Sequence, residues 1–199
     1  MTSETHDLAG LGHWTGPDAA EDILSDDDIR KLGRDLRILL ASNGTLTRIL
    51  GIVADDEIVV HIVAQQVHGQ APGTPGLERL PTGRLLQRRI VLKGRRSGQP
   101  FVAAESLVAV DLLPPAITTT LLETRRPIGE VTAASCLETF KETADVWVAR
   151  PPDWLAAAGF QPSKPSIVVR RYRVITDGRL AIVITEYFLR DDFHSRSVT

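Results

Sequence analysis

The stretch SIVVRRYRVITDGRLAIVITEYFL, residues 166–189, predicts the strongest β-hairpin of the sequence. Two runs rich in β-branched and aromatic residues flank Asp177-Gly178, a dipeptide that supplies the positive φ angles of a type I′ turn. Side chains alternate between the faces of a strand, so four apolar residues of the second run are expected on one face: Leu180, Ile182, Ile184 and Phe188. Glu186 belongs to the same face, and a carboxylate is therefore predicted among core residues.

The first part of the chain predicts a helix, a turn and a strand. Residues 25–44 have the spacing of one amphipathic helix, with Ser25 as the N-cap and Gly44 as the stop. Residues 45–53 predict a short apolar turn, and residues 57–68 have the β-branched richness of a strand.

The middle of the chain predicts a second hairpin behind a long loop. Residues 70–83 are rich in proline and glycine, which indicates a surface loop of a length typical of lids and insertions. Residues 83–94 and 100–110 predict two antiparallel strands joined by a turn.

Two short helices complete the pattern. Residues 113–124 predict a helix that starts after two prolines, and residues 150–160 predict one that ends at Gly159. Residues 135–150 are ambiguous, with residues 144–148 as their most strand-like part. The fold class is therefore α+β, a central and mainly antiparallel sheet with helices packed on one side.

Composition limits the kinds of partner. The 199 residues include 43% hydrophobic and 24% charged residues, enough for one compact domain, and we expect residues 1–24 to be a flexible leader and residues 25–199 the domain. The net charge of −2 argues against a nucleic-acid partner, and the single cysteine excludes an internal disulfide. No apolar run is long enough to span a membrane or resembles an export signal, so the cytoplasm is the expected location.

A second charge is predicted on an inward face. Arg88 lies between Leu86 and Ile90 on the apolar face of its strand, whereas Arg89 points the other way. Two strands from separate hairpins thus each bring one charge inward, Arg88 and Glu186, and burial of charges is costly unless they are paired. One interpretation is a buried Arg88–Glu186 salt bridge, or charges that reach water at strand ends; the other is that both bind one small anionic molecule.

Other candidate residues are weaker. His61 and His68 have no further ligand at metal spacing, so we predict no metal site. Cys136 has no evident base partner and is interpreted as a packed small residue. Residues 170–173, RRYR, are interpreted as exposed strand arginines, with the alternative that one face adds positive potential.

Five motifs resemble the chorismate pyruvate-lyases, especially the mycobacterial-type 4-hydroxybenzoate synthase branch. They occur in order over residues 25–190: TLTR, LLQRRIVLKG, FVAAESLVAV, RPIGEV and RYRVITDGRLAIVITEYFL. The resemblance implies a central antiparallel sheet flanked by helices, a product site enclosed beneath loops, and no cofactor. It also implies elimination of pyruvate from chorismate to leave 4-hydroxybenzoate.

The resemblance further implies roles for particular residues. Arg88 corresponds to the arginine that binds the ring carboxylate, and Glu186 to the glutamate that meets the ring hydroxyl. The remaining pocket positions are Leu46 over the ligand, its neighbours Thr45 and Thr47, and a turn that carries Ile128 and Gly129.

Two departures and one alternative accompany the resemblance. The enterobacterial-type enzymes have an acid after the key arginine and a basic residue after the Leu-Gly turn, whereas this chain has Arg89 and Glu130 there. The same fold serves as an effector-binding domain in transcription regulators, so a non-catalytic binder of small aromatic acids is the alternative function.

Overall fold

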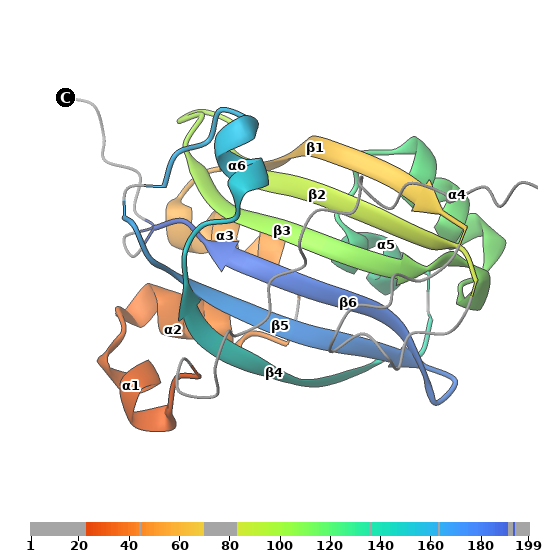
Figure 1. The fold of residues 1–199 in the computed structure, drawn as a ribbon, viewed down its shortest axis with the longest axis horizontal. Helices are drawn as coiled ribbons and strands as arrows, with labels where there is room; N and C mark the ends of the chain where they lie inside the picture. Colours follow the sequence, from red (N-terminus) through yellow and green to blue (C-terminus); the bar gives the residue numbers. More distant parts are fainter. Residues whose placement is uncertain are drawn as a thin grey trace, which may run out of the picture.

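A six-stranded antiparallel sheet forms the centre of the molecule in the computed structural model (Figure 1). The structure describes residues 23–43, 45–69, 83–135, 137–162, 164–190 and 193. The strands are β1 (Ile58–His68), β2 (Leu85–Gly94), β3 (Pro100–Ala109), β4 (Phe140–Ala149), β5 (Ile167–Thr176) and β6 (Arg179–Phe188). Their order in the sheet is β1-β2-β3-β6-β5-β4, and each neighbouring pair is antiparallel.

Short helices precede β1 or connect later strands. They are α1 (Asp26–Lys31), α2 (Arg34–Ala41), α3 (Leu46–Ala54), α4 (Pro115–Glu123), α5 (Ile128–Ala134) and α6 (Asp153–Ala157), together with one 3-10 turn, η2 (Val110–Leu112). The α+β class predicted from the sequence is confirmed.

Both predicted hairpins are present. β5 and β6 are joined by Asp177 and Gly178 with φ angles of 49° and 70°, as a type I′ turn requires. β2 and β3 pair around the turn at residues 95–99. The ambiguous segment forms β4, an edge strand that pairs with β5. Of the loop predicted at residues 70–83, residues 70–82 lie outside the described residues.

The predicted single helix of residues 25–44 is wrong, because two helices form there. Leu32 and Gly33 separate α1 from α2 with extended backbones, at ψ angles of 157° and 145°. Glycine is a poor helix former, and the break frees α2 to turn its apolar face toward the sheet. α2 buries Leu36 and Leu39, whereas α1 has no buried residue.

Two segments predicted as turns are helical. Residues 45–53 belong largely to α3, where Leu46 and Leu50 are buried one helical turn apart. Ile128, expected on a turn, is the first residue of α5 and is buried. Both segments have apolar residues at helical spacing, but the segments are too short for that spacing to indicate a helix.

The helices lie on both faces of the sheet, so the expectation that they pack on one side is wrong. α6 lies against the face opposite α3 and α5 (Figure 1). Its Leu155 packs in a cluster with Val91, Val169 and Tyr187, residues that point to that face. Of the predicted leader, Ile23 and Leu24 are described, and they pair with β4; residues 1–22 lie outside the described residues.

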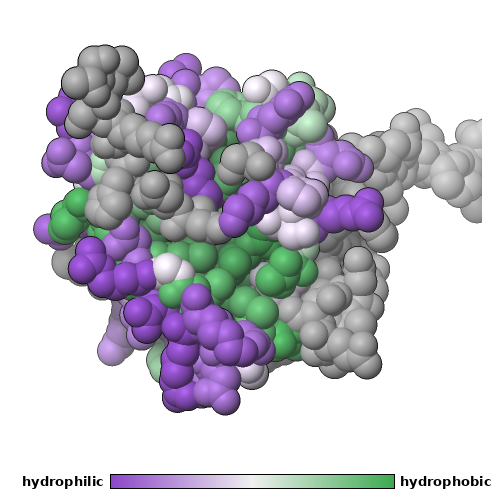
Figure 2. Space-filling view, turned by 90° about the vertical axis from the view of Figure 1, so that its left-hand side faces the viewer, coloured by the Kyte–Doolittle hydropathy of each residue, from purple (hydrophilic) through white to green (hydrophobic). Residues whose placement is uncertain are grey.

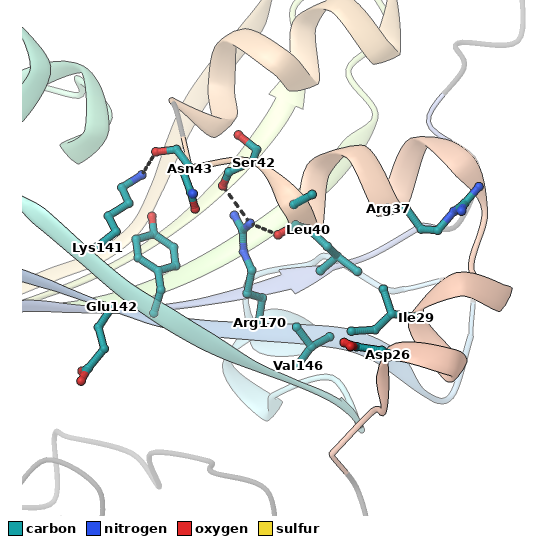
Figure 3. A pocket seen from close by; sticks show the side chains of 12 residues that line it. Asp26, Ile29, Arg37, Leu40, Ser42, Asn43, Lys141, Glu142, Val146 and Arg170 are labelled. Atoms are coloured by element: carbon teal, nitrogen blue, oxygen red, sulfur yellow. Dashed lines mark hydrogen bonds between the residues drawn. The ribbon is translucent and has the colours of Figure 1, made fainter.

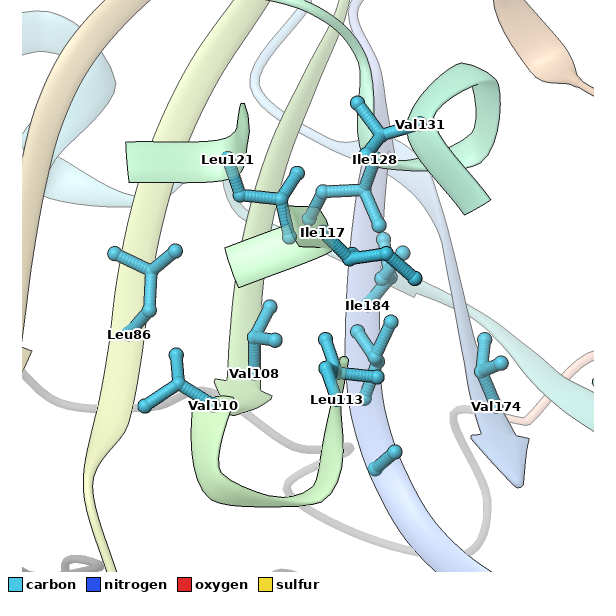
Figure 4. Packing of buried hydrophobic residues seen from close by; sticks show 12 residues of the cluster. Leu86, Val108, Val110, Leu113, Ile117, Leu121, Ile128, Val131, Val174 and Ile184 are labelled. Atoms are coloured by element: carbon cyan, nitrogen blue, oxygen red, sulfur yellow. The ribbon is translucent and has the colours of Figure 1, made fainter. Parts of the chain in front are cut away.

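Two apolar clusters pack on the α3 and α5 face of the sheet. The first joins the strands to α4 and α5 and includes Leu86, Val108, Ile117, Leu121 and Ile128 (Figure 4). The second joins the strands to α2 and α3 and includes Leu39, Leu50, Leu92, Val102 and Phe188. Neither cluster covers the middle of this face of the sheet completely, and a cavity lies there.

Leu180, in the hairpin of residues 166–189, lies on the opposite face of the sheet from the one expected. Ile175 pairs with Leu180, but Val174 pairs with Ile182, so Ala181 is an extra residue in β6. This register shift reverses the alternation. Leu180 therefore packs in a cluster on the opposite face, apart from Ile182, which corrects the expected grouping.

The surface at the end that bears α1 and α2 is mixed. A hydrophobic area lies there among hydrophilic side chains (Figure 2). No described helix is long and apolar enough to cross a membrane.

Candidate active site

A small cavity, the inner cavity, lies between the sheet and the first residues of α3 and α5. Its volume is about 60 Å³. Six of the seven site residues predicted from the sequence line it: Thr45, Leu46, Thr47, Ile128, Gly129 and Glu186. These residues come from three distant parts of the chain, so the fold brings them together.

A band of polar side chains crosses the sheet beneath this cavity. Directly paired residues of neighbouring antiparallel strands point to the same face. One row holds Arg88, Ser106, Ile184 and Tyr172, from β2, β3, β6 and β5. The next row holds Ile90, Ala104, Glu186 and Arg170. The band lies between the two apolar clusters, and the small side chains of β3 leave space above it.

Glu186 is buried and is paired with an arginine of the adjacent strand. Its Oε2 accepts from Nε of Arg170 at 2.9 Å and from Nη2 at 2.5 Å. Nη1 of Arg170 donates to the carbonyls of Leu39, Leu40 and Ser42 at 2.9, 2.7 and 3.2 Å. The last carbonyls of a helix lack partners within it, so Arg170 satisfies the end of α2 while it orients the carboxylate.

Tyr172 adjoins the same carboxylate. Burial raises the pKa of Tyr172 well above its ordinary value, and so do the negative charge of Glu186 and a hydrogen bond to it. The phenol therefore stays protonated and donates to the carboxylate. Glu186 is therefore held by two residues of β5, Arg170 and Tyr172.

Arg88 is 1% exposed and holds the segment between α4 and α5. Its Nη1 donates to the carbonyl of Arg126 at 2.9 Å and its Nη2 to that of Thr124 at 3.1 Å. Its Nε is buried with no hydrogen-bond partner among the described residues. Burial lowers the pKa of Arg88, but a guanidinium remains charged in proteins.

The inner cavity and Arg88 are neighbours rather than in contact. Arg88 does not line the cavity, but Ser106, directly opposite it, does. The segment that Arg88 holds leads into Pro127 and Ile128, which also line the cavity. The direct Arg88–Glu186 salt bridge considered from the sequence does not form, because each group has other partners.

Arg89, one of the two departures from the enterobacterial pattern, lies on the opposite face of the sheet. Its Nε is 2.7 Å from Oε1 of Glu105, which also accepts from Nε2 of Gln87 at 2.7 Å. Burial raises the pKa of Glu105, whereas the charge of Arg89 lowers it. Arg89 therefore points away from the inner cavity and does not line it. The residue of the other departure, Glu130, lies in α5.

A second cavity, the outer cavity, is shown in Figure 3 and shares lining residues with the inner cavity. Its volume is about 370 Å³, and its walls come from α1, α2, β4 and β5. Lys141 and Tyr172 line both cavities. Nζ of Lys141 donates to the carbonyl of Asn43 at 2.8 Å and lies 5.1 Å from the centre of the Tyr172 ring. Burial lowers the pKa of Lys141, whereas the charge of Glu186 raises it.

Arg170 and Lys141 were not identified from the sequence. Arg170 and Arg171, interpreted as exposed, are 5% and 7% exposed. Arg170 lies opposite Glu186 only because of the register shift in β6, which no residue pattern announces. Lys141 lies in the segment whose secondary structure was ambiguous.

Solved structures of transcription regulators share this fold. PhnF from Mycobacterium smegmatis superposes with a TM-score of 0.57 at 13% identity, over 80% of this chain and 71% of that chain. Its effector domain gives 0.55 at 14% identity, over 77% and 93%. A GntR-family regulator from Bacillus cereus gives 0.53 at 14% identity, over 72% and 99%. At such low identity these likenesses concern the fold alone.

Sequence relatives are much closer. The chorismate pyruvate-lyase of Mycobacterium tuberculosis (strain CDC 1551 / Oshkosh) is 57% identical over 176 residues, which cover 87% of this chain and 88% of that protein. The chorismate pyruvate-lyase of Mycobacterium leprae (strain TN) is 57% identical over 170 residues, or 85% and 81%. Residues 40–193 match the family described as "Chorismate pyruvate-lyase Rv2949c-like". The chain therefore belongs to the Rv2949c-like chorismate pyruvate-lyase family.

Proposed function

We propose that this protein eliminates pyruvate from chorismate and releases 4-hydroxybenzoate. The observation that carries the proposal is the inner cavity, an apolar space between sheet and helices that Glu186 faces at one end. Arg88 lies one row further along the sheet. A flat ring with a carboxylate at one end and a hydroxyl at the other matches these two charges.

The spacing of the two charged residues suits such a ring. Arg88 and Glu186 are two strands apart, and they are offset by one row, which is two residues along a strand. With about 4.8 Å between strands and about 3.4 Å per residue, their Cα atoms are separated by roughly 12 Å. Both side chains rise from the same face of the sheet, so in this proposal the ring lies between their ends. Leu46 and Ile128 cover this space from α3 and α5.

In this proposal Arg88 binds the ring carboxylate. Its Nη groups are already engaged by two carbonyls, so a carboxylate approaches from the side that carries Nε. The Nε and Nη2 donors on that side match the two oxygens of a carboxylate. A buried N–H without a partner is costly, so the ligand also relieves that cost.

Glu186 acts at the other end of the ring as the general base. Breaking the ether C–O bond sends its electron pair to the departing enolpyruvyl oxygen. The ring carbon that bears the hydroxyl loses its proton to Glu186, and the C–H pair becomes a ring π bond. The enolpyruvate then takes up a proton at its methylene carbon and becomes pyruvate.

The remaining parts of the proposal follow from this stoichiometry. Aromatisation supplies the driving force and no net oxidation occurs, so the elimination requires no redox cofactor. Residues 25–199 form the catalytic domain in this proposal. A cytoplasmic location is compatible with the single cysteine, Cys136, which cannot form a disulfide within the chain.

The test is turnover of chorismate by the purified protein. We expect pyruvate and 4-hydroxybenzoate in equal amounts, measured by a coupled lactate dehydrogenase assay and by chromatography. Arg88→Ala is expected to lower kcat/KM, because it breaks a buried charged contact. The expected loss of transition-state stabilisation is about 2 to 5 kcal/mol. Arg88→Lys keeps the charge but loses the planar donor pair, so an intermediate loss is expected.

Each outcome decides between the two candidate functions. Binding of 4-hydroxybenzoate without any turnover of chorismate would favour the non-catalytic binder of aromatic acids. An Arg88→Ala variant that is folded and as active as the wild type would refute the role of Arg88.

A further inference from the structure

Lys141 lies where the inner and outer cavities meet. Its side chain lines both, and its Nζ is fixed by the Asn43 carbonyl and by the Tyr172 ring. Tyr172 in turn adjoins Glu186. A cation is therefore positioned beside the end of the inner cavity at which Glu186 acts.

The proposed substrate requires a second anion site at this end. Chorismate carries one carboxylate on the ring and another on the enolpyruvyl ether. The ether is attached to the ring carbon next to the one that bears the hydroxyl. When the hydroxyl faces Glu186, the enolpyruvyl group must therefore project near Glu186 and away from Arg88. The inner cavity, at about 60 Å³, is much smaller than the outer cavity, at about 370 Å³, so the outer cavity offers more space for that side chain.

We propose that Lys141 binds the enolpyruvyl carboxylate and that the outer cavity receives the enolpyruvyl group and releases pyruvate. This inference rests on the proposed function and extends it. The ring thus occupies the inner cavity, with one carboxylate toward Arg88 and the other at Lys141. The product 4-hydroxybenzoate retains only the contact with Arg88.

The other cations that line the two cavities are less suited to this role. Nε and both Nη groups of Arg170 are committed to Glu186 and to the end of α2. Arg37 lies on the exposed side of α2, where water screens its charge. Lys141 is partly buried, so its charge interacts more strongly with a carboxylate.

The test compares substrate with product. In Lys141→Met, which keeps the length of the side chain and removes its charge, we expect KM for chorismate to rise on the order of 10- to 100-fold, as loss of a charged hydrogen bond predicts. The dissociation constant for 4-hydroxybenzoate, measured by titration calorimetry, should change less than about threefold, because the product lacks the enolpyruvyl carboxylate. Lys141→Arg should restore most of the affinity for chorismate.

Lys93→Met is the matched control. Lys93 is a partly buried strand lysine next to Leu92, and because Leu92 lines the cavity, Lys93 points to the opposite face. We expect its kinetics to equal those of the wild type.

The outcomes separate the two proposals. A wild-type protein that does not turn over chorismate refutes the proposed function and this assignment together. If the wild type is active, the assignment alone is overturned when Lys141→Met weakens substrate and product equally, or weakens neither.

Discussion

Glu186 illustrates how a carboxylate is kept in an apolar core. Burial of an ionised carboxylate is costly unless it is paired and hydrogen-bonded. Arg170 and Tyr172 supply these contacts from β5, and Arg170 is itself held by the end of α2. The carboxylate is consequently fixed beside the inner cavity, as its proposed role as a base that reaches one ring proton requires.

The first prediction at the residue scale concerns Glu186→Gln. This variant keeps the shape of the side chain but removes the base, so kcat is expected to fall by about 10² to 10⁴. The dissociation constant for 4-hydroxybenzoate should change only a few-fold, because an amide still contacts the hydroxyl. Steady-state kinetics and calorimetric titration measure the two effects. An equal loss of turnover and of product affinity would show that Glu186 only anchors the ring.

Glu105→Gln is the matched control for Glu186→Gln. Glu105 is also a buried strand glutamate paired with an arginine, but it lies on the opposite face of the sheet. Its replacement should change stability while kcat for chorismate stays unchanged.

At the scale of secondary-structure elements, Asp56 joins two turns that are far apart in the sequence. It follows α3, and its carboxylate accepts from the backbone N–H groups of Arg96 at 3.1 Å and Ser97 at 3.0 Å in the β2–β3 turn. A Cβ at Gly94 would overlap the carboxylate of Asp56 and the hydroxyl of Ser97, so only glycine fits there. The packing of α3, which carries Leu46 into the cavity, thus depends on this junction.

Asp56→Asn tests this junction through its pH dependence. Hydrogen bonds from the Ser97 and Arg96 backbone lower the pKa of Asp56 to about 2, against the opposing effect of burial. A lowered pKa in the folded state means that the stabilisation is complete above the unfolded pKa, near 4, and is lost as pH falls toward 2. In urea unfolding we therefore expect Asp56→Asn to be less stable than the wild type at pH 7, with the difference shrinking between pH 4 and 2.

Asp55→Asn provides the control for this experiment. Asp55 is the adjacent carboxylate, its side chain is 97% exposed, and asparagine tolerates its φ of 47°. The stability of Asp55→Asn should equal that of the wild type at pH 7 and also between pH 4 and 2. A pH-independent loss in Asp56→Asn would show that the charge of Asp56 does not hold the junction.

At the scale of the whole molecule, the inner cavity results from a gap between two cores. One apolar cluster anchors α4 and α5, and the other anchors α2 and α3. Between them the central strand β3 carries the small residues Ala104 and Ser106, which cannot fill the space. A bound aromatic ring would complete the packing between the two clusters.

This arrangement predicts product inhibition and stabilisation by the product. A ligand that binds only the folded state at 100 times its dissociation constant adds about 2.7 kcal/mol of stability. For a chain of this size that corresponds to an increase in Tm of roughly 5 to 10 °C. We expect 4-hydroxybenzoate to raise Tm and to slow initial rates in competition with chorismate. Benzoate, which lacks the hydroxyl, should do both more weakly; no effect of 4-hydroxybenzoate on either measurement would contradict the enclosed site.

Five of the six strands, both hairpins and the inward direction of Arg88 and Glu186 could be predicted from the sequence, whereas the segment that forms β4 was ambiguous. These features depend on alternation and turn chemistry, which act over a few neighbouring residues and so are visible in a pattern. The motif resemblance supplied the cavity-lining positions in α3 and α5, although both segments had been expected to be turns.

The charge that meets Glu186 could not be read from the sequence, because it depends on strand register. From the Asp177-Gly178 turn, regular pairing would place Val169 opposite Glu186, and the extra residue Ala181 brings Arg170 there instead. The helix break at Gly33 and the position of Lys141 between the two cavities could likewise not be predicted from the sequence. The physical reason is the same in each case: packing between distant segments selects register and helix ends, and its energy is absent from any local pattern.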